Sequence, residues 1–449
     1  MSFIPEDMMY AVANMKQVSR NMFRLEQTSS ATAGPNRTVT VNLPSNAILD
    51  MKSFRFCARF TCDDSVSGGS TAHGLLPGYA SSMIQQLSVF INGQQVQQAA
   101  PEYHSIAQAL RLSENCLDRE NSIDKICSHS YISGGNITAS DDEQIVVQDW
   151  CGFLNESSTR YLNSAIVGDI QVRLVLSGND ALVPAINGAQ AGDPLTTPDE
   201  RNAAAGITYS TSDMYFTIAS VNLDSDYDAI LRERLAAGGL EVQYKEHYAF
   251  ELGNITSGSA ALRAALSSQS IDRLNAFWRD SNHNTVGVPA HKLPGATGTG
   301  GVVSNQLRFR AYNNGVFLLP GLGRSSYSIN SVKYPQFDKT LVDCACDLGY
   351  VQDKVGQNQG HQVTSRNSFE DGKYVNSLLL SVPTKMGVAV KGGFDSRGLN
   401  SAIVWDVRGA TVPAANANTG ETGVLSAFMV ASTTATLNIR LGRDLMVVY

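Results

Sequence analysis

Hydrophobic and polar residues alternate over short stretches along most of the chain. In residues 54–60 the hydrophobic residues occupy every second position, opposite Arg55 and Arg59. A period of two over a few residues is typical of a half-buried β-strand. Further stretches of this kind are 38–43, 87–91, 170–176, 214–223, 307–311, 316–319, 375–382, 388–390, 403–407, 424–430, 436–441 and 445–449. We therefore predict an antiparallel β protein whose last two stretches pair around Gly442.

Four segments break the alternation with a spacing closer to that of a helix. They are residues 6–27, 104–112, 227–237 and 260–278. In the last of them, Leu262, Leu266 and Trp278 recur at roughly helical intervals. The chain thus reads as β-rich, then helical near 227–278, then β-rich again. This order favours two β-sandwiches of about 200 residues each.

The segment 6–27 also carries a regular set of cations. Lys16, Arg20 and Arg24 recur every four residues, which puts them on one face of a helix. One interpretation is a surface helix with solvated cations. The other is an amphipathic segment that lies on a membrane or on a partner.

A weak internal similarity links the two halves of the chain. Residues 170–174 (Ile-Gln-Val-Arg-Leu) resemble residues 437–441 (Leu-Asn-Ile-Arg-Leu), and each stretch lies near the end of its half. Strands converge on such patterns by chance, so a duplication and a coincidence are both open.

Composition narrows the class of protein. Only 17% of the 449 residues are charged, against about 25% in an average chain, which suits subunits that bury much of their surface. The net charge of −7 argues against a chain whose main task is to neutralise phosphates, although it leaves room for a local basic face. Seven cysteines are few and odd in number, which indicates a reducing compartment. We expect neither a secretory signal nor a transmembrane helix.

The search for catalytic or metal-binding motifs fails. The glycine-rich loop 294–301 lacks the strand and the lysine of a phosphate-binding loop. Cys344 and Cys346 would share one side of a strand, where a reduced, packed pair is expected rather than a zinc site. His247 lies in an alternating run and is expected to be a satisfied strand histidine, and the Asp141-Asp142 pair falls in a polar turn. We expect no enzyme, no catalytic residue, no metal and no cofactor.

Five segments of the chain follow one another in a recognisable order. They are 43–56, 82–96, 169–176, 214–223 followed by 227–237, and 437–449. In this order they resemble the double jelly-roll major capsid proteins of eukaryotic double-stranded DNA viruses, of the polinton-like virus, adintovirus and virophage type. The resemblance covers residues 20–250, and over 251–449 it rests on the strand rhythm and the terminus. The order of the segments carries the resemblance, not one motif.

The resemblance implies an all-β fold of two consecutive antiparallel jelly-roll β-sandwiches with short helical insertions. Residues 1–30 would form an N-terminal amphipathic arm, 31–240 the first jelly roll and 241–449 the second. Three copies would associate into a pseudo-hexagonal capsomer that tiles an icosahedral shell. The long polar stretches 113–150, 177–213 and 283–305 would be tower or rim loops.

The same resemblance implies the partners and the location. The partners would be further copies of the chain, minor capsid and penton proteins, and an internal membrane where one exists, without specific recognition of nucleic acid. The protein would reside in the virion after synthesis in the host cytoplasm or nucleus. Lys16, Arg20 and Arg24 would contact an internal membrane, a minor capsid protein or nucleic acid on the inner face.

Two other classes stay open at this point. A viral attachment or penton protein, or a carbohydrate-binding β-sandwich, would place a ligand site in the loops and would not tile. A β-sandwich glycoside hydrolase would need two carboxylates of separated pKa across a cleft.

Overall fold

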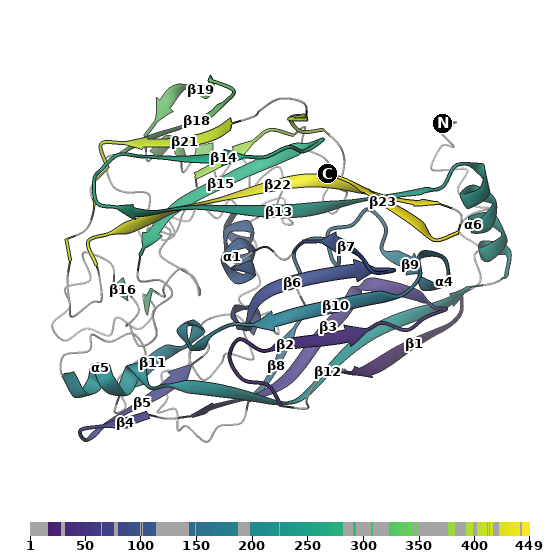
Figure 1. Cartoon of the computed structure of the whole chain (residues 1–449), viewed down its shortest axis with the longest axis horizontal. Coiled ribbons are helices and arrows are strands. Elements are labelled where there is room, and N and C mark those ends of the chain that lie inside the picture. The colour runs from purple at the N-terminus through teal and green to yellow at the C-terminus, as the bar shows by residue number, and fades with distance from the viewer. Residues whose placement is uncertain are drawn as a thin grey trace.

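The fold is described from a computed structural model (Figure 1). The described residues are 17–27, 32–63, 65–75, 80–98, 100, 102–113, 143–148, 150–186, 198–223, 225–281, 291–292, 307–308, 323–340, 342–344, 346–347, 376–381, 392–397, 402–410, 412, 414–415, 422–440 and 442–449. The strands in this part pair antiparallel throughout. No helix in it is both long and apolar enough to cross a membrane.

The first sandwich consists of two facing sheets. What we call the β1 sheet has the strand order β1 (Gln17–Glu26), β12 (Thr208–Leu223), β3 (Ile48–Asp63) and β8 (Glu143–Val147), with β9 (Tyr161–Asn163) also beside β3. What we call the β2 sheet has the order β2 (Thr38–Asn42), β10 (Ile170–Leu176), β6 (Ile84–Ile91) and β7 (Gln94–Gln97).

The second sandwich repeats this plan. Its β13 sheet has the order β13 (Leu240–Ile255), β22 (Leu425–Arg440), β15 (Ile271–Asp280) and β20 (Asn376–Leu379), with β23 (Asp444–Val448) also beside β22. Its β14 sheet has the order β14 (Ala260–Ala265), β21 (Ala402–Arg408), β18 (Arg324–Ile329) and β19 (Val332–Lys339).

The strand order identifies the topology. If β9 and β23 are set aside and the strands of each sandwich are numbered along the chain, one sheet has the order 1-8-3-6 and the other 2-7-4-5. Both sandwiches show this order, which is that of a jelly roll. The predicted fold class is therefore confirmed. The two similar stretches at 170–174 and 437–441 are not equivalent, because the first lies in the seventh strand of its roll and the second in the eighth.

The helix predicted for residues 6–27 is wrong where the chain is described. Residues 17–26 form β1, which pairs with β12. Phe23 and Leu25 pack against the core, whereas Arg20 and Arg24 are exposed. A spacing of four places residues on one side of a strand as well as of a helix, so the cations did not discriminate between the two.

The helix predicted for residues 260–278 is also wrong. The segment forms β14 and most of β15. Leu262 and Trp278 are buried in strands, and the even intervals between the apolar residues satisfy a period of two equally well. The other two predicted helices are confirmed as α1 (Tyr103–Ser113) and α6 (Ser225–Ala237).

Several strand predictions need smaller adjustments. Stretches 424–430 and 436–441 belong almost entirely to one strand, β22, which pairs with β23 as expected. Residues 316–319 and 388–390 lie outside the described residues, and 307–311 is described only at β17 (Leu307–Arg308), opposite β16 (His291–Lys292). The remaining elements are β4 (Ser65–Ser67), β5 (Ser70–Leu75), η2 (Ala80–Met83), α4 (Ser164–Val167), η4 (Asn179–Ala181), β11 (Val183–Ile186) and α5 (Pro198–Ala205).

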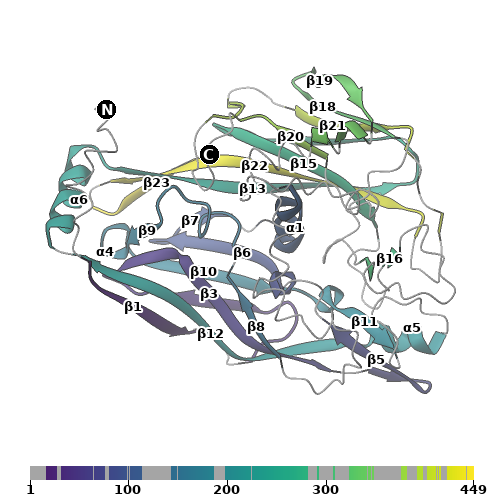
Figure 2. The same ribbon diagram turned by 180° about the vertical axis from the view of Figure 1, so that it is seen from behind.

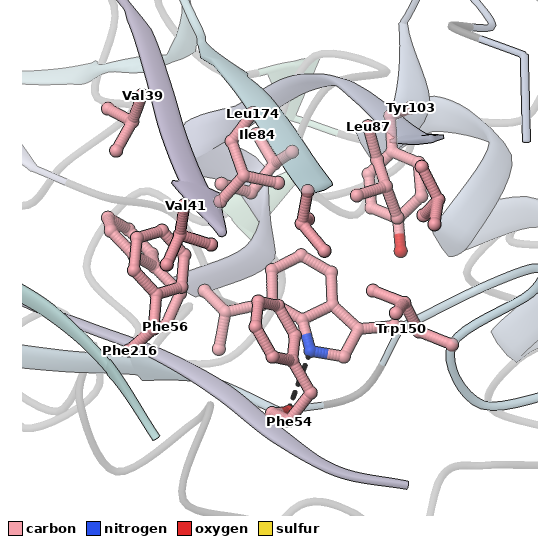
Figure 3. Packing of buried hydrophobic residues seen from close by; sticks show 14 of the residues in the cluster. Val39, Val41, Phe54, Phe56, Ile84, Leu87, Tyr103, Trp150, Leu174 and Phe216 are labelled. Carbon is pink, nitrogen blue, oxygen red and sulfur yellow. Dashed lines mark hydrogen bonds between the residues drawn. The ribbon is translucent and has the colours of Figure 1, made fainter. Parts of the chain in front are cut away.

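Aromatic side chains fill the first core. Phe54 and Phe56 of β3 pack against Phe216 of β12, and Trp150 donates an indole hydrogen bond of 2.9 Å to the carbonyl of Phe54 (Figure 3). Val39 lies among the residues facing them from the β2 sheet (Figure 3). The alternation in residues 54–60 therefore reports burial correctly.

The four large sheets are stacked in one direction. Figures 1 and 2 show the order β1 sheet, β2 sheet, β13 sheet and β14 sheet, with α1 beneath the β13 sheet. The β13 sheet is covered on both sides, because Trp278 faces the second core and Phe277 faces α1. The outward face of the β1 sheet and the β14 sheet thus lie at opposite ends of the stack.

Candidate functional site

The joint between the two rolls is an extensive packed surface. Helix α1 of the first roll lays its apolar face on the β13 sheet of the second. The side chains that meet there are Ile106, Ala109, Leu110, Phe277, Phe428 and Val430. Direct packing of these buried side chains resists movement of one roll against the other.

The second roll also contributes to the core of the first. Val242 and Tyr244 of β13 and Leu437 of β22 belong to the first hydrophobic cluster and are at most 4% exposed. The Tyr244 hydroxyl donates to the carbonyl of Val96 at 2.7 Å. Each of the long strands β13 and β22 therefore runs from one core into the other.

A buried arginine anchors the same joint. Arg279 of β15 is 1% exposed, and its guanidinium contacts Glu102 at 2.5 and 3.1 Å and Glu251 at 2.9 Å. The ring of Phe428 lies 4.4 Å from the guanidinium carbon. Because Glu102 directly precedes α1, this ion pair fixes the start of the helix on the sheet.

A second polar group crosses the joint at His247. Its Nε2 lies 2.7 Å from a Glu156 carboxylate oxygen of the first roll, and its Nδ1 lies 3.0 Å from the Ser432 hydroxyl. Burial alone would raise the pKa of Glu156, but the charge and hydrogen bond of His247, the Gly152 N–H and Arg273 together lower it to about 2. His247 is thus a satisfied strand histidine, as expected.

The neighbouring Glu246 carries a buried carboxyl group. It accepts hydrogen bonds from the Gln98 N–H and the Tyr248 hydroxyl. Burial nevertheless raises its pKa from 4.5 to about 7. Ionisation of this group therefore opposes folding near neutral pH.

The two carboxyls predict the pH dependence of stability. The raised pKa of Glu246 gives stability that is complete below its unfolded value and is lost as pH rises through about 7. The lowered pKa of Glu156 gives stability that is present above its unfolded value and is lost as pH falls towards about 2. We therefore expect the free energy of unfolding to be greatest near pH 5.

Replacing Glu246→Gln should abolish the loss of stability that accompanies the rise of pH through about 7. An amide keeps an acceptor for Gln98 without a charge to bury, so urea unfolding should show a gain of about 2 kcal/mol at pH 8 and little change at pH 5. Glu241→Gln, on the exposed side of the same strand, is the matched control. A loss of stability at pH 8 would contradict the account of Glu246.

The outward face of the β1 sheet carries the cations singled out in the sequence. Arg20 lies 3.7 Å from Asp50, which also binds Arg160 at 2.8 Å. Arg24 stacks over the Tyr215 ring at 4.1 Å. The structure thus places Arg20 and Arg24 on one face, whereas Lys16 lies outside the described residues. The inner-face contact of these residues stays a prediction.

Arg55 extends this face, although the sequence pattern did not single it out. Arg55 of β3 lies in register with Thr217 of β12, which is itself in register with Arg24. Arg59 follows on the same side of β3, 3.6 Å from Asp213. These arginines share a face only because of the strand pairing, and no local sequence motif predicts that pairing.

The predicted strand around Cys344 and Cys346 is wrong. Residues 342–344 and 346–347 are helical, with Cys344 buried and Cys346 exposed. Thr340 and Asp343 cap this turn reciprocally, since each backbone N–H donates to the other's side chain. The spacing Thr-x-x-Asp is a local signal for such a turn, and the strand prediction did not use it.

The other chemical candidates yield no site. In the described ranges, no three His, Cys, Asp or Glu side chains are grouped so as to hold a metal ion. The loop 294–301 and the Asp141-Asp142 pair lie outside those ranges. The residues that remain of interest are those of the joint and those of the outward β1-sheet face.

Solved structures of virus capsids share this fold. One chain of the PBCV-1 virus capsid aligns with a TM-score of 0.58 at 12% identity, over 96% of each chain. A chain of the Sputnik virophage aligns at 0.53 and 10%, over 96% of this chain and 88% of that one. The Faustovirus major capsid protein aligns at 0.51 and 8%, over 94% and 90%. No protein-family model and no curated protein matches the chain.

The likeness covers both rolls. Because 96% of this chain aligns with 96% of the PBCV-1 capsid chain, the shared feature is the pair of rolls and not a single sandwich. The chain therefore has the double jelly-roll fold of the capsid proteins that its sequence resembles.

Proposed function

We propose that this chain is a structural major capsid protein that trimerises into pseudo-hexagonal capsomers of an icosahedral virion shell. The observation that carries the proposal is the rigid stacking of two jelly rolls of identical strand order in one chain. Three copies of a two-lobed body give six similar lobes around a threefold axis, and such a unit fits a near-hexagonal lattice.

The joint between the rolls supports this function. A shell subunit has to keep its shape within the lattice. A flexible hinge between its two lobes would prevent this. Here α1 packs across the joint, Arg279 is paired within it, and β13 and β22 enter both cores. These contacts give the subunit one fixed shape.

The finer parts of the proposal follow the resemblance. The two rolls would be formed by residues 31–240 and 241–449. Residues 1–30 would form an arm, of which β1 belongs to the first roll. The role would be non-enzymatic and the location the virion. The partners would be other copies, minor capsid and penton proteins, and an internal membrane where one exists. The long loops, such as that carrying β11 and α5, would be the variable rim.

Electron microscopy of the purified protein tests this proposal. We expect class averages of a threefold particle with a near-hexagonal outline and two lobes per copy. Single two-lobed particles with no larger assembly would contradict it. That result would favour an attachment or carbohydrate-binding protein, the alternative that shares the β-sandwich architecture.

A further inference from the structure

A lysine and a carboxylate from two different strands of the second roll lie in contact. Lys245 of β13 places its Nζ 2.7 Å from the carboxylate oxygen Oδ2 of Asp272 on β15. The strand between β13 and β15 in the sheet is β22, which carries Thr434. The Asp272 side chain is only 5% exposed, and Thr434 is fully buried. The two reactive groups are therefore held together where little water reaches the carboxylate.

The hydroxyl of Thr434 connects the two charged groups. It accepts a hydrogen bond of 2.8 Å from Lys245 Nζ and donates one of 2.7 Å to Oδ2 of Asp272. A hydroxyl that accepts from one group and donates to the other can pass a proton between them. The ammonium and the carboxylate can thus become an amine and a carboxylic acid. Burial favours this exchange, because removal from water costs a neutral pair less than an ion pair.

The other carboxylate oxygen of Asp272 has a fixed donor. Ser270 donates its hydroxyl to Oδ1 at 2.8 Å, and the N–H of Gly393 donates to the Ser270 hydroxyl at 2.9 Å. A Cβ at position 393 would lie 2.8 Å from Oδ1 and 2.2 Å from the carbonyl oxygen of Ile271, so only glycine lets the backbone come this close. The Ser270 hydroxyl is therefore oriented to stabilise negative charge that develops on Oδ1.

We propose that Lys245 and Asp272 join in an intramolecular isopeptide bond. After proton transfer through Thr434, the amine Nζ attacks Cγ of Asp272, so that the Nζ–Cγ bond forms and the Cγ–Oδ2 bond breaks. Oδ2 leaves as water, with the proton that came through Thr434 and a second proton from Nζ. Oδ1 becomes the amide oxygen and keeps its hydrogen bond from Ser270. The reaction needs no oxidant and no co-reactant.

The fold supplies what a free amine and a free carboxylic acid lack in water. Groups held in contact within one molecule reach effective concentrations of about 10⁵ M or more, and the water is released from a buried carboxyl group. Contact alone is not enough. Lys333 and Asp338 also pair, but their side chains are 38% and 37% exposed, so water keeps both of them ionised. We expect no bond between those two residues.

The bond would fasten strands that are shared by both cores. It would tie the first strand of the second roll, β13, to the third, β15, across the eighth, β22. Because β13 and β22 also enter the first core, the link would strengthen the joint as well as the second roll. The proposal requires no partner and does not depend on the assembly proposed above.

Mass spectrometry of the full-length protein under denaturing conditions tests for the bond. The protein should be lighter than its sequence mass by one water, whereas Lys245→Arg should keep its full mass, because a guanidinium stays protonated. A protease digest should contain one pair of peptides joined between residues 245 and 272. Lys333→Arg is the matched control and should still lack one water. A protein that is folded by circular dichroism but has its full sequence mass, or a link at another lysine, would overturn the proposal.

Thr434→Val tests the proton relay separately. Valine keeps the shape of threonine but has no hydroxyl, so bond formation should slow by about 100-fold or more. The mass of the protein is followed over time after its synthesis in a cell-free extract. Thr433→Val is the matched control, because Thr433 is also buried on β22 but donates to the carbonyl of Glu246. Equal rates in the two variants would show that Thr434 does not carry the proton.

Discussion

Replacing Arg279→Ala is expected to destabilise the protein by about 3–5 kcal/mol, because it removes the buried guanidinium that binds the carboxylates of both Glu102 and Glu251 at the joint. The substitution also removes the guanidinium from the ring of Phe428. Urea unfolding at one fixed protein concentration measures the loss. Arg279→Lys should recover only part of it, since an ammonium group cannot bind both carboxylates in the same plane.

The control for Arg279 is an exposed ion pair. Arg397 binds Asp395 at 2.7 Å, with both side chains about half exposed. Arg397→Ala should therefore cost less than about 1 kcal/mol, because solvent screens such pairs. Equal losses for the two substitutions would show that Arg279 does not anchor the joint.

Leu437→Ala is expected to loosen the first roll, although the residue lies on a strand of the second. Its side chain is fully buried in the first core beside Val242 and Tyr244. Truncation of such a side chain costs about 2–5 kcal/mol. Hydrogen exchange should rise in β3 and β10 of the first roll as well as in β13 and β22, because the core they share loses packing.

Leu252→Ala on β13 is the matched control for Leu437, since its side chain is 37% exposed. It should change the free energy of unfolding by less than about 1 kcal/mol. If the faster exchange in Leu437→Ala stayed within β13 and β22, the two cores would be independent. The account of a single stiff body would then be wrong.

The sequence predicted most of the architecture because alternation reports burial locally. Phe54, Phe56 and Phe60 are buried opposite exposed Arg55 and Arg59, and such a pattern needs no knowledge of distant residues. It failed where intervals of four fitted a strand and a helix alike, as at Arg20 and Arg24. It failed also at Cys344, where the Thr340 cap outweighed an apparent period of two.

The residues that meet at the joint and on the outward β1-sheet face could not be predicted from local sequence patterns. Arg279 binds Glu102, from which it is 177 residues distant in the sequence, and Arg24 lies two strands from Arg55, with β12 between them. Strand order decides both placements, and register then sets which side chains are neighbours. A single sequence fixes neither, so both placements emerged only from the structure.

The most direct test of the account is the solution mass of the purified protein, measured by light scattering behind a sizing column. A closed trimer of the 48.2 kDa chain has a mass of about 145 kDa, and the account predicts that value over a wide range of concentration. A monodisperse mass of one chain, unchanged as the concentration rises, would contradict it.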